Sequence, residues 1–323
     1  MGRNGLRLSA VGYIHPAMSL TLVLLGTSAS RPTVERNVSS IALVREGETM
    51  LFDCGEGTQR QMMRYGVAFS LSDIFFTHFH ADHVIGVIGL MRTMALQGRT
   101  DELRLWGPKG ASRHLKRAEQ FGVDRLTFPV NISEIESEQR IERKDYAIVP
   151  FEVDHGPGPS FGYALVEQQR KGRFNPDKAR SLGVTEGPLW GKIHKGESVT
   201  LENGRVVEAA ELVGPPRPGR TVVITGDTRP CDATERAATN ADLLVHEATF
   251  GDEEAERAVE TGHSTAREAA QLAHRAKCRR LLLTHFSARY SRDAAELETQ
   301  AKSEFAETAI AKDGMQVEIP YRE

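Results

Sequence analysis

The chain has few cysteines, no long apolar run and no excess of positive charge. Only Cys54, Cys231 and Cys278 occur among its 323 residues, without a Cys-x-x-Cys pair, which excludes a disulfide scaffold and fits a reducing compartment. No apolar segment reaches the roughly 20 residues that a membrane-spanning helix needs. The formal net charge of −3 predicts no general affinity for nucleic acid, so any RNA contact requires a local basic surface.

Short apolar segments alternate with helical patterns from Leu20 to the C-terminus. Helices are expected after residue 83, at 113–120, after residue 263 and at 292–308. This mixture of hairpins and crossover helices predicts an α/β or α+β layered fold. Strands are predicted at residues 20–25, 41–44, 50–52, 148–153, 161–166, 222–225, 243–246, 281–284 and 315–319.

The N-terminal segment only faintly imitates a secretory signal. Its apolar stretch at residues 20–25 is short and runs directly into a Gly-Thr turn, as a strand would. We therefore expect residues 1–17 to be a disordered extension of a cytoplasmic protein, with the folded domain spanning residues 18–323.

The densest group of potential ligands is the run THFHADH at residues 77–83. It follows an apolar strand pattern and holds His78, His80, Asp82 and His83. Imidazole and carboxylate groups together suit Zn²⁺ and similar divalent ions. The alternative, a solvated loop that happens to be rich in histidine, is disfavoured by the ordered spacing. The spacing indicates two metal ions rather than one.

Three further candidates, His155, Asp227 and His285, each follow an apolar run by one to three residues. Strand ends converge on a crevice, so these side chains are expected to join the first motif. The simplest allocation gives one ion His78, His80 and His155, gives the other Asp82, His83 and His285, and makes Asp227 the bridge. Two ions ~3.5–4 Å apart can generate a nucleophile and stabilise the leaving oxygen of a phosphodiester.

Four residues are candidates for roles beside the metals. Asp82 is also placed to accept or steer the proton of the attacking water. His263, at a helix start, and Glu247 are expected to protonate a leaving alkoxide. Asp53, in a glycine-rich turn, is expected to orient a ligand histidine, and ordinary turn chemistry is the alternative.

Residues 167–205 break the pattern, since apolar runs give way to glycine, proline and charge. The segment lies between candidate ligands and is therefore an insertion rather than a linker. Two interpretations stay open: a disordered surface loop, or a protruding arm whose cations face phosphates, with Phe174 and Trp190 stacking or anchoring. Its cations include Arg170, Lys171, Arg173, Lys178, Arg180, Lys192 and Lys195.

With these motifs in place, the chain resembles the metallo-β-lactamase superfamily from about Ser19 to the C-terminus. The His-x-His-x-Asp-His run, His155, Gly-Asp-Thr around Asp227 and His285 are similar to the superfamily's ligand series. Narrower motifs resemble the ribonuclease Z family of tRNA 3′-processing endonucleases. They are Phe-Asp-Cys-Gly-Glu-Gly-Thr-Gln at 52–59, His-Glu-Ala-Thr at 246–249, His-Ser-Thr at 263–265 and Gly-Pro-Leu-Trp-Gly at 187–191.

The resemblance implies a four-layer αββα sandwich with a protruding flexible arm, two Zn²⁺ per subunit and a homodimer. One subunit's arm would grip tRNA for the other's active site, through residues such as Arg170, Lys171, Arg173, Lys192 and Lys195. The implied reaction removes the 3′ trailer of precursor tRNA by cleaving 3′ of the discriminator nucleotide, leaving a 3′-hydroxyl. Asp82 would be the proton acceptor, with Glu247 and His263 serving the leaving group.

One loop departs from the family pattern. Residues 32–37 resemble its Pro-x-Lys-x-Arg-Asn loop near the tRNA 3′ end, but Val34 replaces the lysine. The change removes a phosphate or base contact and bears on discrimination against mature CCA ends. Arg36 and Asn37 are expected to remain as tRNA contacts.

Three other functions compete with this one. A small-molecule phosphodiesterase or other hydrolase of the superfamily would share every metal ligand but would not need the basic arm. A 5′-to-3′ exonuclease of the RNA-processing branch usually carries an inserted domain for which this chain has no room. A non-catalytic RNA-binding module is disfavoured by the intact ligand series.

Overall fold

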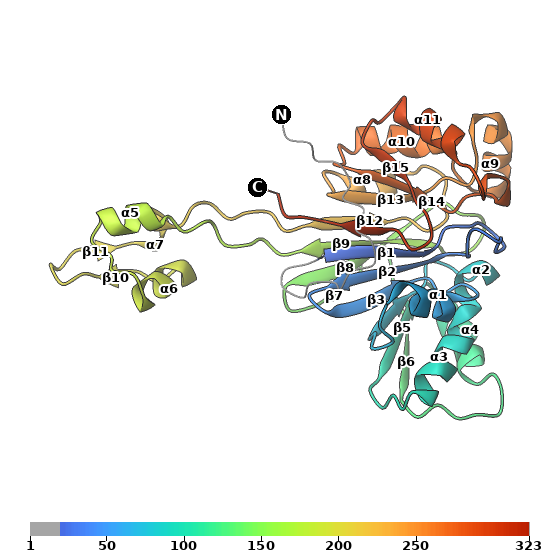
Figure 1. Ribbon diagram of the computed structural model, residues 1–323, viewed down its shortest axis with the longest axis horizontal. Helices are drawn as coiled ribbons and strands as arrows, with labels where there is room; N and C mark the ends of the chain where they lie inside the picture. Colours follow the sequence, from blue (N-terminus) through green and yellow to red (C-terminus); the bar gives the residue numbers. More distant parts are fainter. Residues whose placement is uncertain (1–19, 323) are drawn as a thin grey trace.

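The computed structural model describes residues 20–322, so the predicted N-terminal extension at residues 1–17 lies outside the described residues. Two seven-stranded sheets lie face to face, and helices cover the outer face of each (Figure 1). This is the four-layer αββα arrangement. Among the described helices, none combines the length and apolar character needed to cross a membrane.

The first sheet has the strand order β16-β1-β2-β3-β4-β5-β6, antiparallel through β3 and parallel beyond it. The strands predicted at 41–44 and 50–52 form a hairpin, and the strand predicted at 315–319 lies at the edge of the sheet. The strands are β1 (Leu20–Gly26), β2 (Ser40–Arg45), β3 (Glu48–Phe52), β4 (Asp73–Phe75), β5 (Leu103–Gly107), β6 (Val130–Glu134) and β16 (Gln316–Glu318). Its helices are α1 (Thr58–Tyr65), α2 (Ala81–Val84), α3 (Gly86–Leu96) and α4 (Ala111–Glu119).

The second sheet has the order β15-β14-β13-β12-β9-β8-β7, with β12 to β15 parallel. Its strands are β7 (Ile141–Glu142), β8 (Tyr146–Glu152), β9 (Phe161–Glu167), β12 (Thr221–Ile224), β13 (Leu243–Glu247), β14 (Leu281–Thr284) and β15 (Thr308–Ile310). Its helical elements are α8 (Asp232–Ala238), η1 (Asp252–Glu254), α9 (Ala255–Thr261), α10 (Ala266–Arg275), η2 (Ala288–Tyr290) and α11 (Ala295–Lys302).

Strand β1 shows why the central strands are continuously apolar. Leu22 and Leu24 belong to the core that includes the facing sheet, whereas Val23 and Leu25 belong to the core beneath α1, α3 and α4. Both faces of the strand are covered, so neither face carries polar residues. The two cores together hold the strand ends rigidly at the edge where the ligands lie.

The helix predicted at residues 292–308 is wrong in its length. Helix α11 ends at Lys302, and Thr308 begins β15, which pairs in parallel with β14. The sequence Ser-Glu-Phe-Ala-Glu at 303–307 is compatible with a helix, but the sheet edge offers the following residues hydrogen bonds and burial. Tertiary pairing therefore overrides the local helical pattern.

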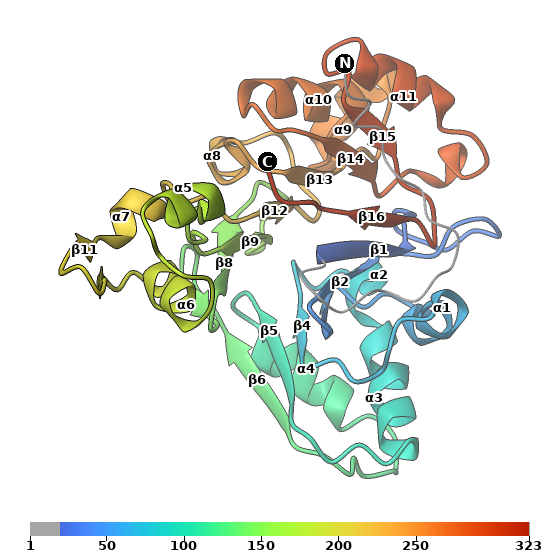
Figure 2. The same ribbon diagram turned by 60° about the vertical axis from the view of Figure 1, so that its left-hand side comes forward.

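Between β9 and β12 the chain leaves the sheet as a protruding arm (Figures 1 and 2). The arm has its own small core, and Phe174 and Trp190 pack together in it, with ring centroids 5.1 Å apart. These two rings therefore anchor the arm. Its elements are α5 (Pro176–Ser181), α6 (Pro188–Lys195), β10 (Val199–Thr200), β11 (Val206–Val207) and α7 (Ala209–Leu212).

Candidate metal centre and active site

The predicted ligands converge because their strands end at one edge of the sandwich. His78 follows β4, His155 follows β8, Asp227 follows β12 and His285 follows β14. Each loop turns toward the space between the sheets at the carboxyl end of its strand. His285 has a φ of +57°, a left-handed conformation that non-glycine residues adopt at a cost of about 1–3 kcal/mol.

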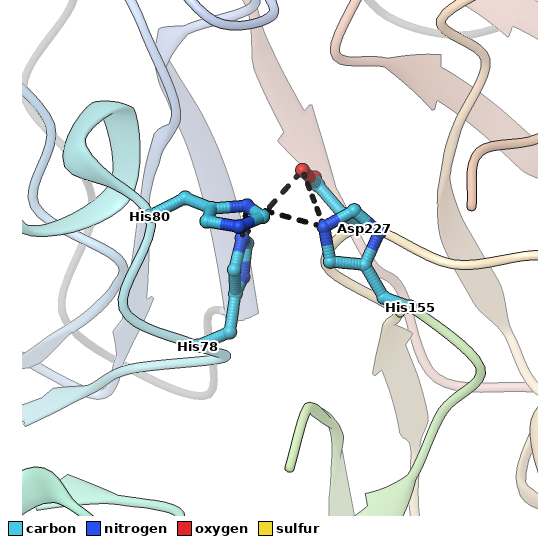
Figure 3. Close-up of side chains that lie close together, drawn as sticks. All are labelled: His78, His80, His155 and Asp227. Atoms are coloured by element: carbon cyan, nitrogen blue, oxygen red, sulfur yellow. Dashed lines mark hydrogen bonds and ion pairs between the residues drawn. The ribbon is translucent and has the colours of Figure 1, made fainter. Parts of the chain in front are cut away.

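One group of ligand atoms comes from His78, His80, His155 and Asp227 (Figure 3). His80 Nδ1 lies 3.0 Å from His78 Nε2 and 3.2 Å from His155 Nε2. The Asp227 carboxylate approaches from the other side, with Oδ2 3.7 Å from His78 Nε2 and 3.9 Å from His155 Nε2. Three imidazoles and a carboxylate at these separations suit one four-coordinate metal ion.

The second group consists of Asp82, His83 and His285. Asp82 Oδ2 lies 3.5 Å from the Nε2 atoms of both His83 and His285. Asp227 reaches this group as well, with Oδ2 3.3 Å from His83 Nε2 and Oδ1 3.2 Å from His285 Nε2. Asp227 is therefore a carboxylate that adjoins both groups.

His80 faces the cluster through Nδ1, whereas neighbouring groups hold the other ligand imidazoles through their Nδ1 atoms. Asp53 Oδ2 lies 2.7 Å from His83 Nδ1, where the predicted orienting residue should be. The Gly262 carbonyl oxygen lies 2.8 Å from His155 Nδ1, and Thr249 Oγ1 lies 3.0 Å from His285 Nδ1. Because Nδ1 of His83, His155 and His285 is engaged, Nε2 of these three rings faces the centre, which is how proteins commonly orient metal-binding histidines.

Unpartnered buried atoms test whether a metal fits. Among the described residues, Nε2 of His83, Nε2 of His285 and Oδ1 of Asp227 are buried without a hydrogen-bond partner. Leaving such an atom unsatisfied costs about 1–3 kcal/mol, and here all three belong to the proposed second ion's surroundings. Bound cations would satisfy them, so the donor set fits a metal centre.

Protonation of the ligands also suits metal binding. Burial, followed by repulsion from His83, holds the pKa of His78 well below its usual range, so this imidazole is neutral. Burial opposes ionisation of Asp227, but His285 and His83 outweigh it and hold the pKa of that carboxyl well below its usual range. Burial likewise opposes protonation of His83, yet Asp227 and Asp53 raise its pKa, so a proton there would compete with a cation.

Glu247 and His263 form a pair beside the ligands. Glu247 Oε1 lies 2.7 Å from His263 Nδ1, and the Thr228 and Thr249 backbone N–H groups donate to the Glu247 carboxylate at 3.0 Å. Burial opposes protonation of His263, but Glu247 outweighs it and raises the pKa of the imidazole to about 9. His263 packs 4.8 Å from His155 and 5.4 Å from His285, measured between ring centroids. The pair therefore adjoins both ligand groups.

Arg36, expected to contact tRNA, lies buried among neighbouring loops. Only 6% of Arg36 is exposed, and its guanidinium donates to Thr27 Oγ1 and to the carbonyl oxygens of Ser291 and Ala311. Its donors therefore hold neighbouring loops together. Asn37 is half-buried, and its side-chain amide donates to the Glu56 carbonyl. Val34, by contrast, is 97% exposed.

The arm cations fall into two groups. Lys171, Arg173, Lys192 and Lys195 are exposed. Arg170 instead lies half-buried at the root of the arm, where its guanidinium carbon is 3.5 Å from the ring centroid of Tyr321. The first four are available to an anionic partner, whereas Arg170 helps to fix the arm to the body.

Sequence reasoning missed three groups that orient the ligands. Thr77, in the ligand-rich run itself, has Oγ1 2.9 Å from His78 Nδ1. Thr249 lies in a run already noted for Glu247, so its hydroxyl was a visible candidate. Gly262 contributes only its backbone carbonyl to His155, and no side-chain pattern signals such a contact.

Comparison with known proteins places this fold and site in a family. A model described as the β-lactamase superfamily domain matches residues 48–181 and 193–286. A ribonuclease Z of Gemmatimonas aurantiaca is 61% identical, with 95% of this chain and 98% of the relative covered. A ribonuclease Z of Myxococcus xanthus is 53% identical, covering 94% and 99%. The crystal structure of human tRNase Z, short form, has a TM-score of 0.68 at 28% identity, covering 93% and 99%.

The fold and the ligand series thus define a protein of the metallo-β-lactamase superfamily. Within that superfamily, the full-length likeness to the curated relatives shows that the chain belongs to the ribonuclease Z family.

Proposed function

We propose that this protein is a cytoplasmic endoribonuclease that removes 3′ trailers from precursor tRNA, cleaving 3′ of the discriminator nucleotide and leaving a 3′-hydroxyl. The observation that supports it most is the pair of ligand groups joined at Asp227 beside Glu247 and His263, in a ribonuclease Z family chain. The cytoplasmic location follows from the proposed substrate, which is made inside the cell.

The cofactor in this proposal is two Zn²⁺ per subunit. His78, His80 and His155 would hold one, Asp82, His83 and His285 the other, and Asp227 both. When bound, the ions supply a nucleophile at neutral pH and neutralise charge on the phosphate. The histidine-rich donor set favours zinc over magnesium or calcium, which prefer oxygen ligands.

The chain's own acid and base groups lie around the ions. Asp82 is the proposed proton acceptor; burial opposes its ionisation, but the contact with His285 and the nearby His83 lower its pKa. The Ser30 backbone N–H donates to its Oδ2 at 2.7 Å, which fixes the carboxylate. His263, protonated at neutral pH through Glu247, is the proposed donor to the leaving 3′-oxygen of the tRNA.

The arm is the proposed tRNA-binding element. Its exposed cations Lys171, Arg173, Lys192 and Lys195 suit backbone phosphates. The arm extends from the opposite side of the molecule to α2, the helix that begins directly after His80 (Figure 1). An arm so placed can serve the active site of a second subunit better than its own.

We therefore include a homodimer in the proposal. The region of α1 to α3 exposes Met63, Ile85 and Leu96, apolar side chains of the kind that an interface covers. Sedimentation of the purified protein tests this part, with a dimer expected.

A cleavage map tests the function. Zinc-loaded protein is incubated with a precursor tRNA carrying a 3′ trailer, with and without chelator, and the product ends are identified. A single chelator-sensitive cut after the discriminator is expected. An intact precursor, with metal bound and a small phosphodiester still hydrolysed, would favour the small-molecule phosphodiesterase instead.

A further inference from the structure

Helix α4 lies beside the metal-binding loop because of the strand order. It follows β5, which pairs in parallel with β4, and β4 leads directly into His78. The Phe76 backbone N–H donates to the Trp106 carbonyl at 2.8 Å, so the two strand ends stay together up to the loop. The N-terminal end of α4 therefore adjoins the active-site edge of the first sheet.

The surface around α4 is cationic. Lys109, Arg113 and Arg117 are exposed, and among the described residues none of them lies within 4.0 Å of a carboxylate. Lys116 is instead paired with Glu119 at 2.8 Å. The nearby Glu134 carboxylate is occupied by the backbone N–H groups of Gly110 and Ser112, at 3.1 and 3.0 Å. Arg113 Nη2 lies 3.0 Å from His114 Nε2, so its charge, like those of Lys109 and Arg117, is not neutralised by a carboxylate. These three charges stand out in a protein whose net charge is −3.

An aromatic pair joins this surface to the metal ligands. Phe79, between His78 and His80 in the chain, stacks on His114 of α4, with centroids 5.0 Å apart and planes 16° apart. A Cβ at Gly107 would come within 3.0 Å of the Phe79 ring, so this glycine leaves room for the ring. Burial and the neighbouring Arg113 and Arg117 lower the pKa of His114, which keeps its ring neutral.

We propose that Phe79, His114, Lys109, Arg113 and Arg117 bind the single-stranded 3′ trailer of the precursor RNA, and this inference rests on the proposed function. Proteins bind single-stranded RNA through exposed cations along the backbone and aromatic rings for the bases, and both lie together here. We call these five residues the α4 surface.

The location separates the trailer from the tRNA side of the cut. The proposed donor to the leaving tRNA oxygen, His263, has ring contacts with His155, Phe250 and His285. Phe79 has ring contacts with Phe76 and His114 instead. The α4 surface therefore flanks the His78 and His80 side of the centre, away from His263, where the RNA downstream of the cut can leave.

The test varies the trailer length. Precursor tRNAs with a single-nucleotide trailer and with a trailer of about 10 nucleotides, within the range of single-strand sites, are cleaved in parallel. In the double variant R113E/R117E, the ratio of kcat/KM for the long trailer to that for the short trailer is expected to fall about tenfold. That factor corresponds to about 1.4 kcal/mol of lost binding to the transition state.

The matched control is R236E/K277E, which reverses two exposed cations on the helix side of the second sheet. Its ratio should equal that of the unmodified protein, and equal melting temperatures would show that both double variants fold. An unchanged ratio in R113E/R117E overturns the proposal. An equal loss on both substrates also overturns it, because α4 would then contact the tRNA body.

A binding measurement separates this inference from the proposed function. Fluorescence anisotropy follows a labelled trailer oligonucleotide bound to the zinc-loaded protein, with weaker binding expected for R113E/R117E than for the control. If the protein cuts no precursor but keeps this α4-dependent binding, the proposed function is wrong, whereas RNA binding by the α4 surface is supported. If all variants bind the trailer equally while the protein cuts precursors correctly, only the proposed trailer-binding role of the α4 surface is overturned.

Discussion

The metal centre and the arm use polar residues in opposite ways. In the centre, most imidazoles and carboxylates are buried, and a neighbour holds them, as Asp53 holds His83. In the arm, exposed cations such as Lys192 and Lys195 surround a small apolar core that is separate from the cores of the body. Bond cleavage demands atoms fixed in place, whereas phosphate binding tolerates mobile charges. Chemistry and tRNA recognition should therefore be separable by mutation.

The largest effect is expected at Asp227, the carboxylate that adjoins both ligand groups. Asp227→Ala should lower cleavage of precursor tRNA and of a small phosphodiester by at least about a thousandfold, beyond the 10–100-fold typical of residues that only orient ligands. Metal analysis should show loss of bound zinc. Full activity on either substrate would contradict the prediction that both reactions depend on Asp227.

Substitution of His263 tests proton donation to the leaving group separately from metal binding. His263→Ala should slow cleavage of precursor tRNA by about 100-fold or more, because a poor leaving alkoxide needs a proton. Hydrolysis of a small phosphodiester with a nitrophenolate leaving group should fall much less, since that group leaves without one. Steady-state rates on both substrates give the comparison. Equal losses would assign His263 to metal-site structure rather than to proton donation.

Removal of the arm should greatly weaken tRNA recognition while leaving small-phosphodiester hydrolysis intact. A variant joining Arg170 to Arg217, whose backbones already pair, through a short glycine linker deletes the arm's core and exposed cations. Its kcat/KM for precursor tRNA should fall by about 100-fold through lost phosphate contacts, while small-phosphodiester hydrolysis persists. Retention of tRNA cleavage at ordinary salt would show that the body alone recognises the substrate.

The smallest effect is expected at the root of the arm. The Tyr321 ring lies between Arg170, at 3.5 Å, and Arg220, at 3.9 Å, and Arg220 is paired with Glu167 at 2.7 Å. Loss of about 0.5–1 kcal/mol of cation–π contact in Tyr321→Ala should raise KM for precursor tRNA about threefold. Tyr321→Phe keeps the ring and is the control. A fall in kcat on the small substrate instead would indicate damage to the body.

Some features of the molecule are local and were therefore predictable. An apolar run followed by a ligand residue marks a strand end, which is why His155, Asp227 and His285 were identified and lie together in the structure. The strands at 41–52 and near 316–318 are likewise recognisable as short apolar runs in the sequence. The charge of the arm is likewise a property of composition.

Other features depend on contacts between distant segments. Burial of Arg36 depends on the carbonyls of Ser291 and Ala311, far along the chain, and no local sequence pattern predicts these contacts. The early end of α11 depends on the free edge of β14. The anchoring of Phe174 and Trp190 depends on scattered apolar residues that assemble only when the arm folds.

The sequence by itself therefore determined which residues are metal-ligand candidates, where strands end and which segment interrupts the domain. These properties depend on residue type and spacing along a few turns of chain. Only the tertiary structure decided that Asp227 adjoins both ligand groups, that the Gly262 carbonyl orients His155 and that α4 presents its cations beside Phe79. Such arrangements arise when two sheets pack, because packing sets distances between residues that the chain itself leaves far apart.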